Sequence, residues 1–338
     1  MSDEALSTPP PPAFINRRPG LIGCGVVHLL FGLMFIGFSL LMVLMVTAMK
    51  NAPQSAQMPA GMVVYTSLFY VILAALFITL GAGSMMARRW APPLILVTSW
   101  AWLVSGVVGG IMMALILPKT MASLPNAQPG AQAFTLGCMG VSVGLFGIAV
   151  PLAFILFYRS THVKATVEAL DPVPRWTDRH PVSILIFASW MFFGAICVLL
   201  SSFMYKALPF GGFMLRGWPV FAVMASMATL LFWIGAGTLR RSQAAWWSGV
   251  GMMILGVLWG VSFMMSDPKT LYDAMGMTLD ANQEAVTRAM YSSPVFYVWI
   301  AVVWIGYLAF LLYLRRYFFP QSKPHSEGPA IQPPVDLQ

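Results

Sequence analysis

The chain has 338 residues, of which 59% are hydrophobic and 9% are charged. Soluble domains carry about 25% charged residues, so this composition excludes a soluble globular protein. The formal net charge is +8, but the basic residues stand in small groups at the ends of apolar runs. No single basic face is expected, which argues against nucleic acid as a partner. The lipid bilayer is the expected surroundings instead.

Eight apolar runs follow one another, and each can cross the hydrocarbon core, for which a helix needs about 20 residues. They predict an all-α integral membrane protein with eight transmembrane helices, at about 21–49, 62–86, 93–117, 134–158, 182–205, 218–239, 244–265 and 294–317. Membrane β-strands are a poor alternative, because they are about 10 residues long and alternate in polarity, whereas these runs do neither.

Lysine and arginine divide unequally between the two sides that eight spans create. Thirteen of the 19 fall on the side that holds both chain ends and residues 159–181. Because cytoplasmic loops carry the excess of basic residues, we expect an integral protein of the plasma (inner) membrane with both termini in the cytoplasm. Residues 1–20 and 318–338 are rich in proline and polar residues, which predicts disordered cytoplasmic tails.

The second half of the sequence repeats short motifs of the first half in the same order. Examples are Gly81-Ala82-Gly83-Ser84 with Gly235-Ala236-Gly237-Thr238, Arg88-Arg89 with Arg240-Arg241, and Gly106-x-x-x-Gly110 with Gly256-x-x-x-Gly260. We therefore predict two four-helix repeats of the same, parallel topology at 21–158 and 182–317, related by a pseudo-twofold axis along the membrane normal. The cytoplasmic linker at 159–181 joins them, and residues 160–170 are expected to extend the fourth helix until Asp171-Pro172 ends it.

Glycines at helical spacing mark the expected contacts between spans. Lipid gives no hydrophobic drive for helix association, so small residues that allow close backbone approach are favoured at the contacts. The predicted helix-packing residues are Gly106 and Gly110 in the third span, Gly137, Gly140, Gly144 and Gly147 in the fourth, and Gly256 and Gly260 in the seventh. This pattern is typical of packing and does not specify a partner.

Cys24 and His28 are the only residue pair in the spans with metal-binding potential. They stand four residues apart and therefore share a helix face. A stable metal site needs about four ligands, and the spans contain no other histidine and no carboxylate. We therefore expect no metal and no cofactor, and interpret His28 as a neutral structural residue that is bonded to a neighbouring helix. The methionine pairs are interpreted as core filler and not as copper ligands.

The longest loop on the side opposite the linker begins with Asp267 and Pro268. An aspartate followed by proline is typical of a helix N-cap and first helical position. Further along, Glu284 and Arg288 have the i, i+4 spacing of a helical ion pair. We expect this loop to pack as a lid on the span ends, with a binding surface as the alternative.

The functional prediction rests mainly on what the spans lack. No Asp, Glu, Lys, Arg, Asn or Gln lies in the interior of a predicted span, and ion-coupled transporters usually need such groups. No catalytic motif occurs in a suitable context. The first hypothesis is therefore a non-enzymatic scaffold or partner-binding subunit, with a membrane protein or a second copy as partner. The alternative is a facilitator or channel for a small neutral or apolar solute, and an enzyme or metal site at Cys24 and His28 ranks third.

Overall fold

A computed structural model describes residues 14–48, 60–122, 129–205, 207–210, 213–265, 267–274, 284, 287–288 and 293–319. Eight helical segments in this part of the chain are long and apolar enough to cross a membrane. The chain is therefore a multi-pass membrane protein, and the predicted number of spans is confirmed. Most of the two predicted tails lies outside the described residues.

The eight spans follow the predicted order closely. They are α1 (Arg18–Ala48), α2 (Ala60–Met85), α3 (Ala91–Ala122), a fourth span made of α4 (Pro129–Ser142), η3 (Val143–Ala149) and α5 (Val150–Tyr158), then α7 (Val182–Ser201), α8 (Trp218–Leu239), α9 (Gln243–Met265) and α12 (Pro294–Phe318). Helix α1 begins three residues before the predicted span, because Pro19 fits the first helical turn, where no backbone N–H is needed. Helix α7 ends at Ser201, four residues before the predicted Tyr205.

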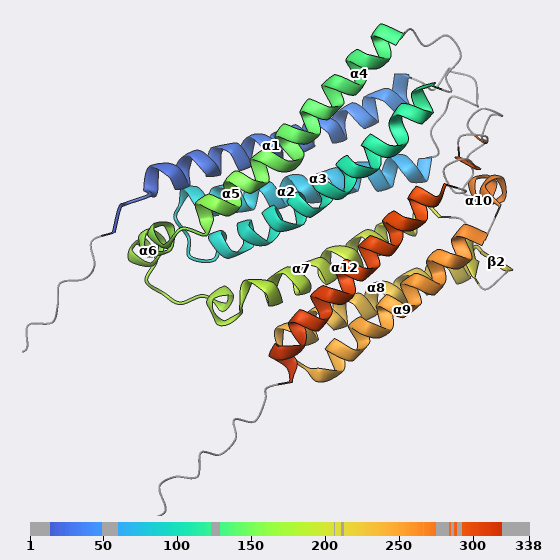
Figure 1. The fold of residues 1–338 in the computed structure, drawn as a ribbon. Coiled ribbons are helices and arrows are strands. Elements are labelled where there is room, and N and C mark those ends of the chain that lie inside the picture. The colour runs from blue at the N-terminus through green and yellow to red at the C-terminus, as the bar shows by residue number, and fades with distance from the viewer. Residues whose placement is uncertain are drawn as a thin grey trace, which may run out of the picture.

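The spans form two groups that lie side by side (Figure 1). The first group contains α1, α2, α3 and the α4–η3–α5 span, and the second contains α7, α8, α9 and α12. Helix α7 connects the groups, because it packs on α3 and α2. Phe69 of α2 meets Phe193 of α7 across this junction, with ring centroids 5.9 Å apart.

The two ends of the bundle differ in the elements that they carry. The start of α1, the end of α12 and the short helix α6 (Thr161–Leu170) lie at one end, which we call the linker end (Figure 1). The opposite end, which we call the hairpin end, carries the antiparallel strands β1 (Ala207–Phe210) and β2 (Phe213–Arg216). Helix α10 (Pro268–Ala274) also lies there, and the carboxylate of Asp267 accepts a hydrogen bond from the Thr270 backbone N–H, as expected for its N-cap.

The prediction that residues 160–170 extend the fourth helix is wrong. The helix ends at Tyr158, and Ser160 adopts an extended conformation with φ −64° and ψ 135° before α6 begins. Val163 and Val167 of α6 are buried against Leu21 and Phe154. Burial of these two valines stabilises the bend at Ser160, because a continuous helix would carry them away from the first group. A 3-10 turn, η4 (Trp176–Arg179), then leads into α7.

The fourth span contains a π-helical turn, η3, which a single proline explains. Pro151 has no N–H to donate to the carbonyl four residues earlier, and its ring crowds that carbonyl. The N–H of Val150 bonds to the Leu145 carbonyl, five residues back. Such π turns are one way in which membrane helices satisfy backbone groups near a proline. Because a π turn accommodates extra residues, Gly137 and Gly140 before η3 do not stay on the face of Gly147.

The turns α2–α3 and α8–α9 have the same backbone geometry. Ala87 and Arg241 have positive φ angles of 49° and 54°. The N–H of Arg88 bonds to the Gly83 carbonyl at 2.8 Å, and the N–H of Ser242 bonds to the Gly237 carbonyl at 2.9 Å. The donors lie three residues beyond the helix ends Met85 and Leu239, and such bonds are typical of helix C-caps. In this geometry Arg241 corresponds to Ala87. The pairs Arg88-Arg89 and Arg240-Arg241, which were matched in the sequence, therefore occupy different positions in the two turns.

The predicted packing glycines divide into those with close neighbours and those without. Cβ atoms added at Gly106 and Gly147 would meet across the α3–η3 contact, and one added at Gly106 would collide with the Gly147 backbone. One at Gly110 would lie 2.9 Å from Val143, and one at Gly256 would meet the Trp304 ring of α12. At the remaining four positions no described atom lies within 4 Å of the added Cβ: Gly137, Gly140, Gly144 and Gly260.

We predict that Gly106→Leu destabilises the fold, whereas Gly109→Leu on the same helix does not. A leucine at 106 must push α3 away from the Gly147 backbone, a cost on the order of 1–3 kcal/mol. At Gly109 an added Cβ meets no described atom within 4 Å. Thermal unfolding in detergent measures both variants. Equal melting temperatures for the two would show that the α3–η3 contact is not needed for stability.

Candidate functional site

Cys24 and His28 lie on α1 in the linker half of the first group. His28 is only 1% exposed, and its ring packs between aromatic side chains of two neighbouring spans. The ring centroids of Phe154 on α5 and Phe77 on α2 lie 4.4 Å and 5.7 Å away. His28 is therefore part of the core of the first group, with its ring enclosed by apolar neighbours.

The hydrogen bond of the His28 ring lies within its own helix. The distance from Nδ1 to the Cys24 carbonyl oxygen is 2.9 Å. A carbonyl can only accept, so Nδ1 must carry the hydrogen and donate it. We expected this side chain to bond to a neighbouring helix, and the Nδ1 bond is instead to α1. The histidine contacts its neighbouring spans through the faces of its ring.

Three spans are connected by a buried chain of hydrogen bonds that we call the Ser84 chain, made of Ser84, Tyr158 and the Leu21 carbonyl. Ser84 Oγ donates to the Leu21 oxygen at 2.8 Å. Because its hydrogen is then used, the Tyr158 hydroxyl must donate to Ser84 Oγ, 2.6 Å away. The Cys24 thiol also interacts with the Tyr158 hydroxyl. The chain therefore joins α1, α2 and α5 in a region where unpaired polar groups are costly.

Only an indirect signal for the Ser84 chain is present in the amino-acid sequence. Ser84 closes the repeated Gly81-Ala82-Gly83-Ser84 motif, and Tyr158 ends the fourth predicted span. The motif indicates a close approach of α2 to its neighbour, but it does not reveal which hydroxyl faces Ser84. That partnership depends on the rotation of α5, which follows the π turn in the fourth span.

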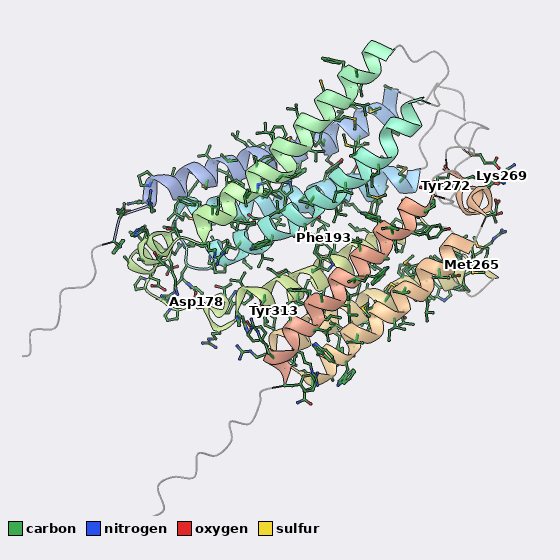
Figure 2. The ribbon with its side chains drawn as sticks, in the orientation of Figure 1. Asp178, Phe193, Met265, Lys269, Tyr272 and Tyr313 are labelled. Atoms are coloured by element: carbon green, nitrogen blue, oxygen red, sulfur yellow. The ribbon has the colours of Figure 1, made fainter. Side chains whose placement is uncertain are left out.

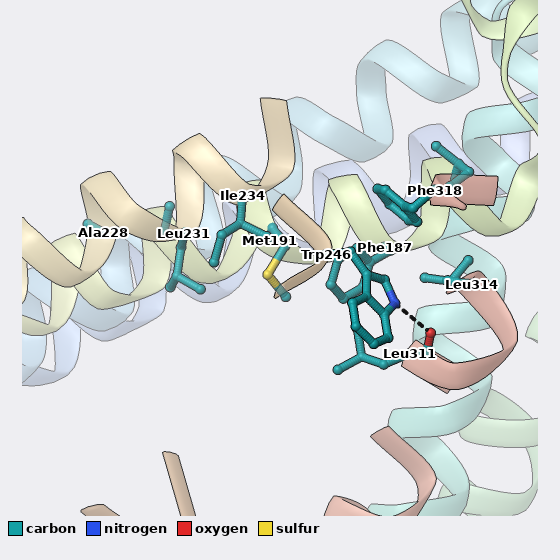
Figure 3. Close-up of a cluster of buried hydrophobic side chains, with 11 residues drawn as sticks. Phe187, Met191, Ala228, Leu231, Ile234, Trp246, Leu311, Leu314 and Phe318 are labelled. Atoms are coloured by element: carbon teal, nitrogen blue, oxygen red, sulfur yellow. Dashed lines mark hydrogen bonds between the residues drawn. The ribbon is translucent and has the colours of Figure 1, made fainter. Parts of the chain in front are cut away.

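The second group holds its spans together by different contacts. The hydroxyl of Thr238 donates to the Ile234 carbonyl of its own helix at 2.8 Å. The link between spans is made by Trp246 of α9, whose Nε1–H donates to the Leu311 carbonyl of α12 at 2.9 Å (Figure 3). Leu314 and Phe187 are buried around this indole. An aromatic core thus replaces the hydroxyl chain of the first group.

Cys24 and His28 do not gather further metal ligands around them. Within the described ranges, no group of three or more His, Cys, Asp or Glu side chains is placed to hold a metal ion. Catalytic zinc sites use three protein ligands and structural sites use four. The Cys24 thiol instead lies beside the Tyr158 hydroxyl of the Ser84 chain.

A network of ion pairs at the linker end is built around Arg89, which lies in the α2–α3 turn. Its Nε lies 2.7 Å from Asp178 Oδ2 and its Nη2 lies 3.4 Å from Glu168 Oε1. The Nε contact is an ion pair without hydrogen-bond geometry. Its backbone N–H donates to Asp171, and Arg175 also bonds that carboxylate. The network thus fastens the linker segment around Asp178 (labelled in Figure 2) to the first group.

Asp171 is held in its ionised form by this network. The backbone N–H of Arg89 makes the largest contribution to lowering the pKa of the Asp171 carboxyl, and hydrogen bonding to Arg175 and the charges of Arg175 and Arg88 act in the same direction. Burial opposes them but is outweighed. Because Asp171 is at the end of α6, its carboxylate connects the linker helix directly to the α2–α3 turn.

No protein-family model, no curated protein and no solved structure matches this chain. The conclusions on function therefore rest on the geometry of the spans and of their contacts.

We predict that Tyr158→Phe lowers stability in detergent, because Ser84 Oγ then loses the hydroxyl that donates to it. Hydrogen bonds between membrane helices contribute about 0.6 kcal/mol on average and reach about 2. Combined with Ser84→Ala in a double-mutant cycle, the two changes should be non-additive. Tyr297→Phe is the control, since Tyr297 is 45% exposed. Additive losses from Tyr158→Phe and Ser84→Ala would show that the two hydroxyls do not interact.

We predict that Asp171→Asn removes stability at neutral pH and removes less at acidic pH. A lowered folded-state pKa stabilises the fold above the usual carboxyl value of 3.8, and this contribution disappears as the pH falls through the folded-state pKa. The melting temperatures of wild type and variant in detergent should therefore converge when the pH is lowered from 7 to 3. A difference that stays constant over this range would contradict the assigned role of the charge.

Proposed function

We propose that the chain is a non-enzymatic membrane scaffold or partner-binding subunit, whose docking surface is the hairpin-end half of the fourth span. Helix α4 packs mainly on α3 and η3 among the described elements, and it projects beyond the rest of the first group in Figure 1. Phe134 and Val141 on this helix are 74% and 69% exposed. The proposal rests on this exposed surface of α4, which the other described helices leave largely uncovered.

The glycines of α4 favour a second helix as the occupant of this surface. Gly137 and Gly140 on α4 and Gly144 in η3 have no described atom within 4 Å of an added Cβ. An added Cβ at Gly147, by contrast, would contact the backbone of Gly106. A face of small residues allows another backbone to approach closely in lipid. The proposed partner is thus a transmembrane helix of another membrane protein or of a second copy of this chain.

A duplicated architecture is part of the proposal. The equal geometry of the α2–α3 and α8–α9 turns, which are 154 residues apart, supports two repeats of parallel topology at 21–158 and 182–317. So does the pairing of α1 with α2 and of α7 with α8, which are the two most extensive helix contacts. In the plasma (inner) membrane, the excess of basic residues favours a cytoplasmic location for the linker end and both termini.

The alternative function, a facilitator for a small neutral or apolar solute, has weaker support. Within the spans, four buried side-chain polar atoms have no hydrogen-bond partner among the described residues: the hydroxyls of Ser67 and Ser99 and the indole nitrogens of Trp259 and Trp299. The hydroxyls belong to α2 and α3, and the indoles to α9 and α12. They are thus divided between the two groups and do not favour one continuous polar path.

Site-specific photocrosslinking in native membranes tests the docking surface. A photoreactive residue at Gly140, on the proposed docking surface, should crosslink to a partner protein. One at Leu152, which is 42% exposed on α5 outside this surface, should crosslink only to lipid. Protein adducts at neither position would contradict the scaffold proposal. Solute flux into liposomes that contain the purified chain alone, without protein adducts at 140, would favour the facilitator.

A further inference from the structure

The linker end of the second group carries positive charge that no carboxylate of the described residues pairs with. The charge comes from five arginines: Arg179, Arg240, Arg241, Arg315 and Arg316. In the part of the chain that the structure describes, no carboxylate lies within 4 Å of any of them. The acidic residues of the second group all lie in the loop between α9 and α12, which is at the hairpin end. The linker network by contrast pairs Arg89 and Arg175 with carboxylates.

Several of these arginines meet around the first turn of α7. Arg241, at the end of α8, donates from Nη2 to the Arg179 carbonyl oxygen at 3.2 Å. On α12, the Tyr317 hydroxyl interacts with Ser183 in the first turn of α7. Arg316 donates to this Tyr317 hydroxyl at 2.9 Å. Residues from α8, α12 and the segment before α7 therefore lie near the start of α7 at the linker end.

The guanidinium of Arg316 is held in place by aromatic rings. It lies 4.0 Å from the centroid of the Tyr313 ring and 4.8 Å from that of Tyr317, and it also donates to the Tyr313 hydroxyl. Tyr313 is labelled in Figure 2. A side chain that is already ordered loses less entropy when it binds a ligand. Arg316 is thus oriented before any anion arrives.

His180 lies beside these charges with an unused polar atom. Its Nδ1 is buried and has no hydrogen-bond partner among the described residues. Burial lowers the pKa of His180, and the charges of Arg241 and Arg179 lower it further. An anion at this position would offset the repulsion between the positive groups and could accept hydrogen bonds from them.

The depth of this cluster in the membrane identifies the anion. The spans α7 and α9 begin at Val182 and Gln243, so the cluster stands where lipid headgroups lie. Trp176 and Trp247 are 51% and 60% exposed at the same end, as expected for aromatic residues at the membrane interface. We propose that Arg179, His180, Arg241 and Arg316 bind the phosphate of an anionic phospholipid headgroup. This proposal is independent of the scaffold role of α4.

Lipid-dependent thermal unfolding of the full chain in detergent tests the site. Added phosphatidylglycerol should raise the melting temperature to a plateau, whereas phosphatidylcholine or inorganic phosphate at the same concentration should not. Arg179→Gln combined with Arg241→Gln should weaken the apparent affinity for phosphatidylglycerol by about tenfold or more. Arg179→Lys combined with Arg241→Lys keeps both positive charges but cannot form the bidentate hydrogen bonds of a guanidinium. Its affinity for phosphatidylglycerol should therefore lie between those of the wild type and the glutamine double variant.

The control removes the same charge from the same end of the first group, through Arg17→Gln combined with Arg18→Gln. An equal loss of affinity in this control would overturn the proposal, because it would indicate a general effect of surface charge. Equal stabilisation by phosphate, or by phosphatidylcholine, would also overturn it. If the Arg179 and Arg241 variant does not fold, the single change Arg316→Gln on the exposed face of α12 replaces it, and an unchanged affinity there would contradict the site.

Discussion

Close backbone contact between neighbouring helices is the interaction on which this fold depends. Inside the hydrocarbon core, apolar side chains gain little by leaving lipid, so helices associate through packing and hydrogen bonds. Gly25 and Gly81 provide such a contact between α1 and α2, because an added Cβ on either would lie 2.7 Å from a carbonyl oxygen of the other helix. Gly106 and Gly147 do so between α3 and the fourth span. The first group is assembled from these two approaches.

Close approach in turn determines which polar groups can meet. Because α2 lies against α1, Ser84 reaches the Leu21 carbonyl and also accepts from Tyr158. In the second group a bulky aromatic core around Trp246 and Phe187 fills the corresponding space between helices. The two groups thus share turn geometry at α2–α3 and α8–α9, while their internal contacts differ. At the linker end the two groups also differ, because ion pairs hold the first group. The arginines of the second group have no carboxylate partner within the described ranges.

The spans could be predicted because the thickness of the bilayer imposes their length and composition, and every run of sufficient hydropathy became a helix. The break at Ser160 could not, because it depends on burial of Val163 and Val167 by residues distant in sequence. The strands β1 and β2 were missed although Gly211-Gly212 between them is a typical signal of a two-residue hairpin loop. Of the candidate site, Cys24 and His28 were found by residue type, but Tyr158 was not, since helix rotation selects it.

The most direct test of the account is the sidedness of the loops, because two four-span units of parallel topology require it. In a chain whose cysteines Cys24, Cys138 and Cys197 are replaced by serine, single cysteines at Ala165, Ser242 and Thr270 can be probed in intact cells with a membrane-impermeant maleimide. We expect labelling of position 270 alone, with 165 and 242 reactive only after the membrane is opened. Labelling of 165 or 242 from outside intact cells, or protection of 270, would contradict the eight-span arrangement and its proposed orientation.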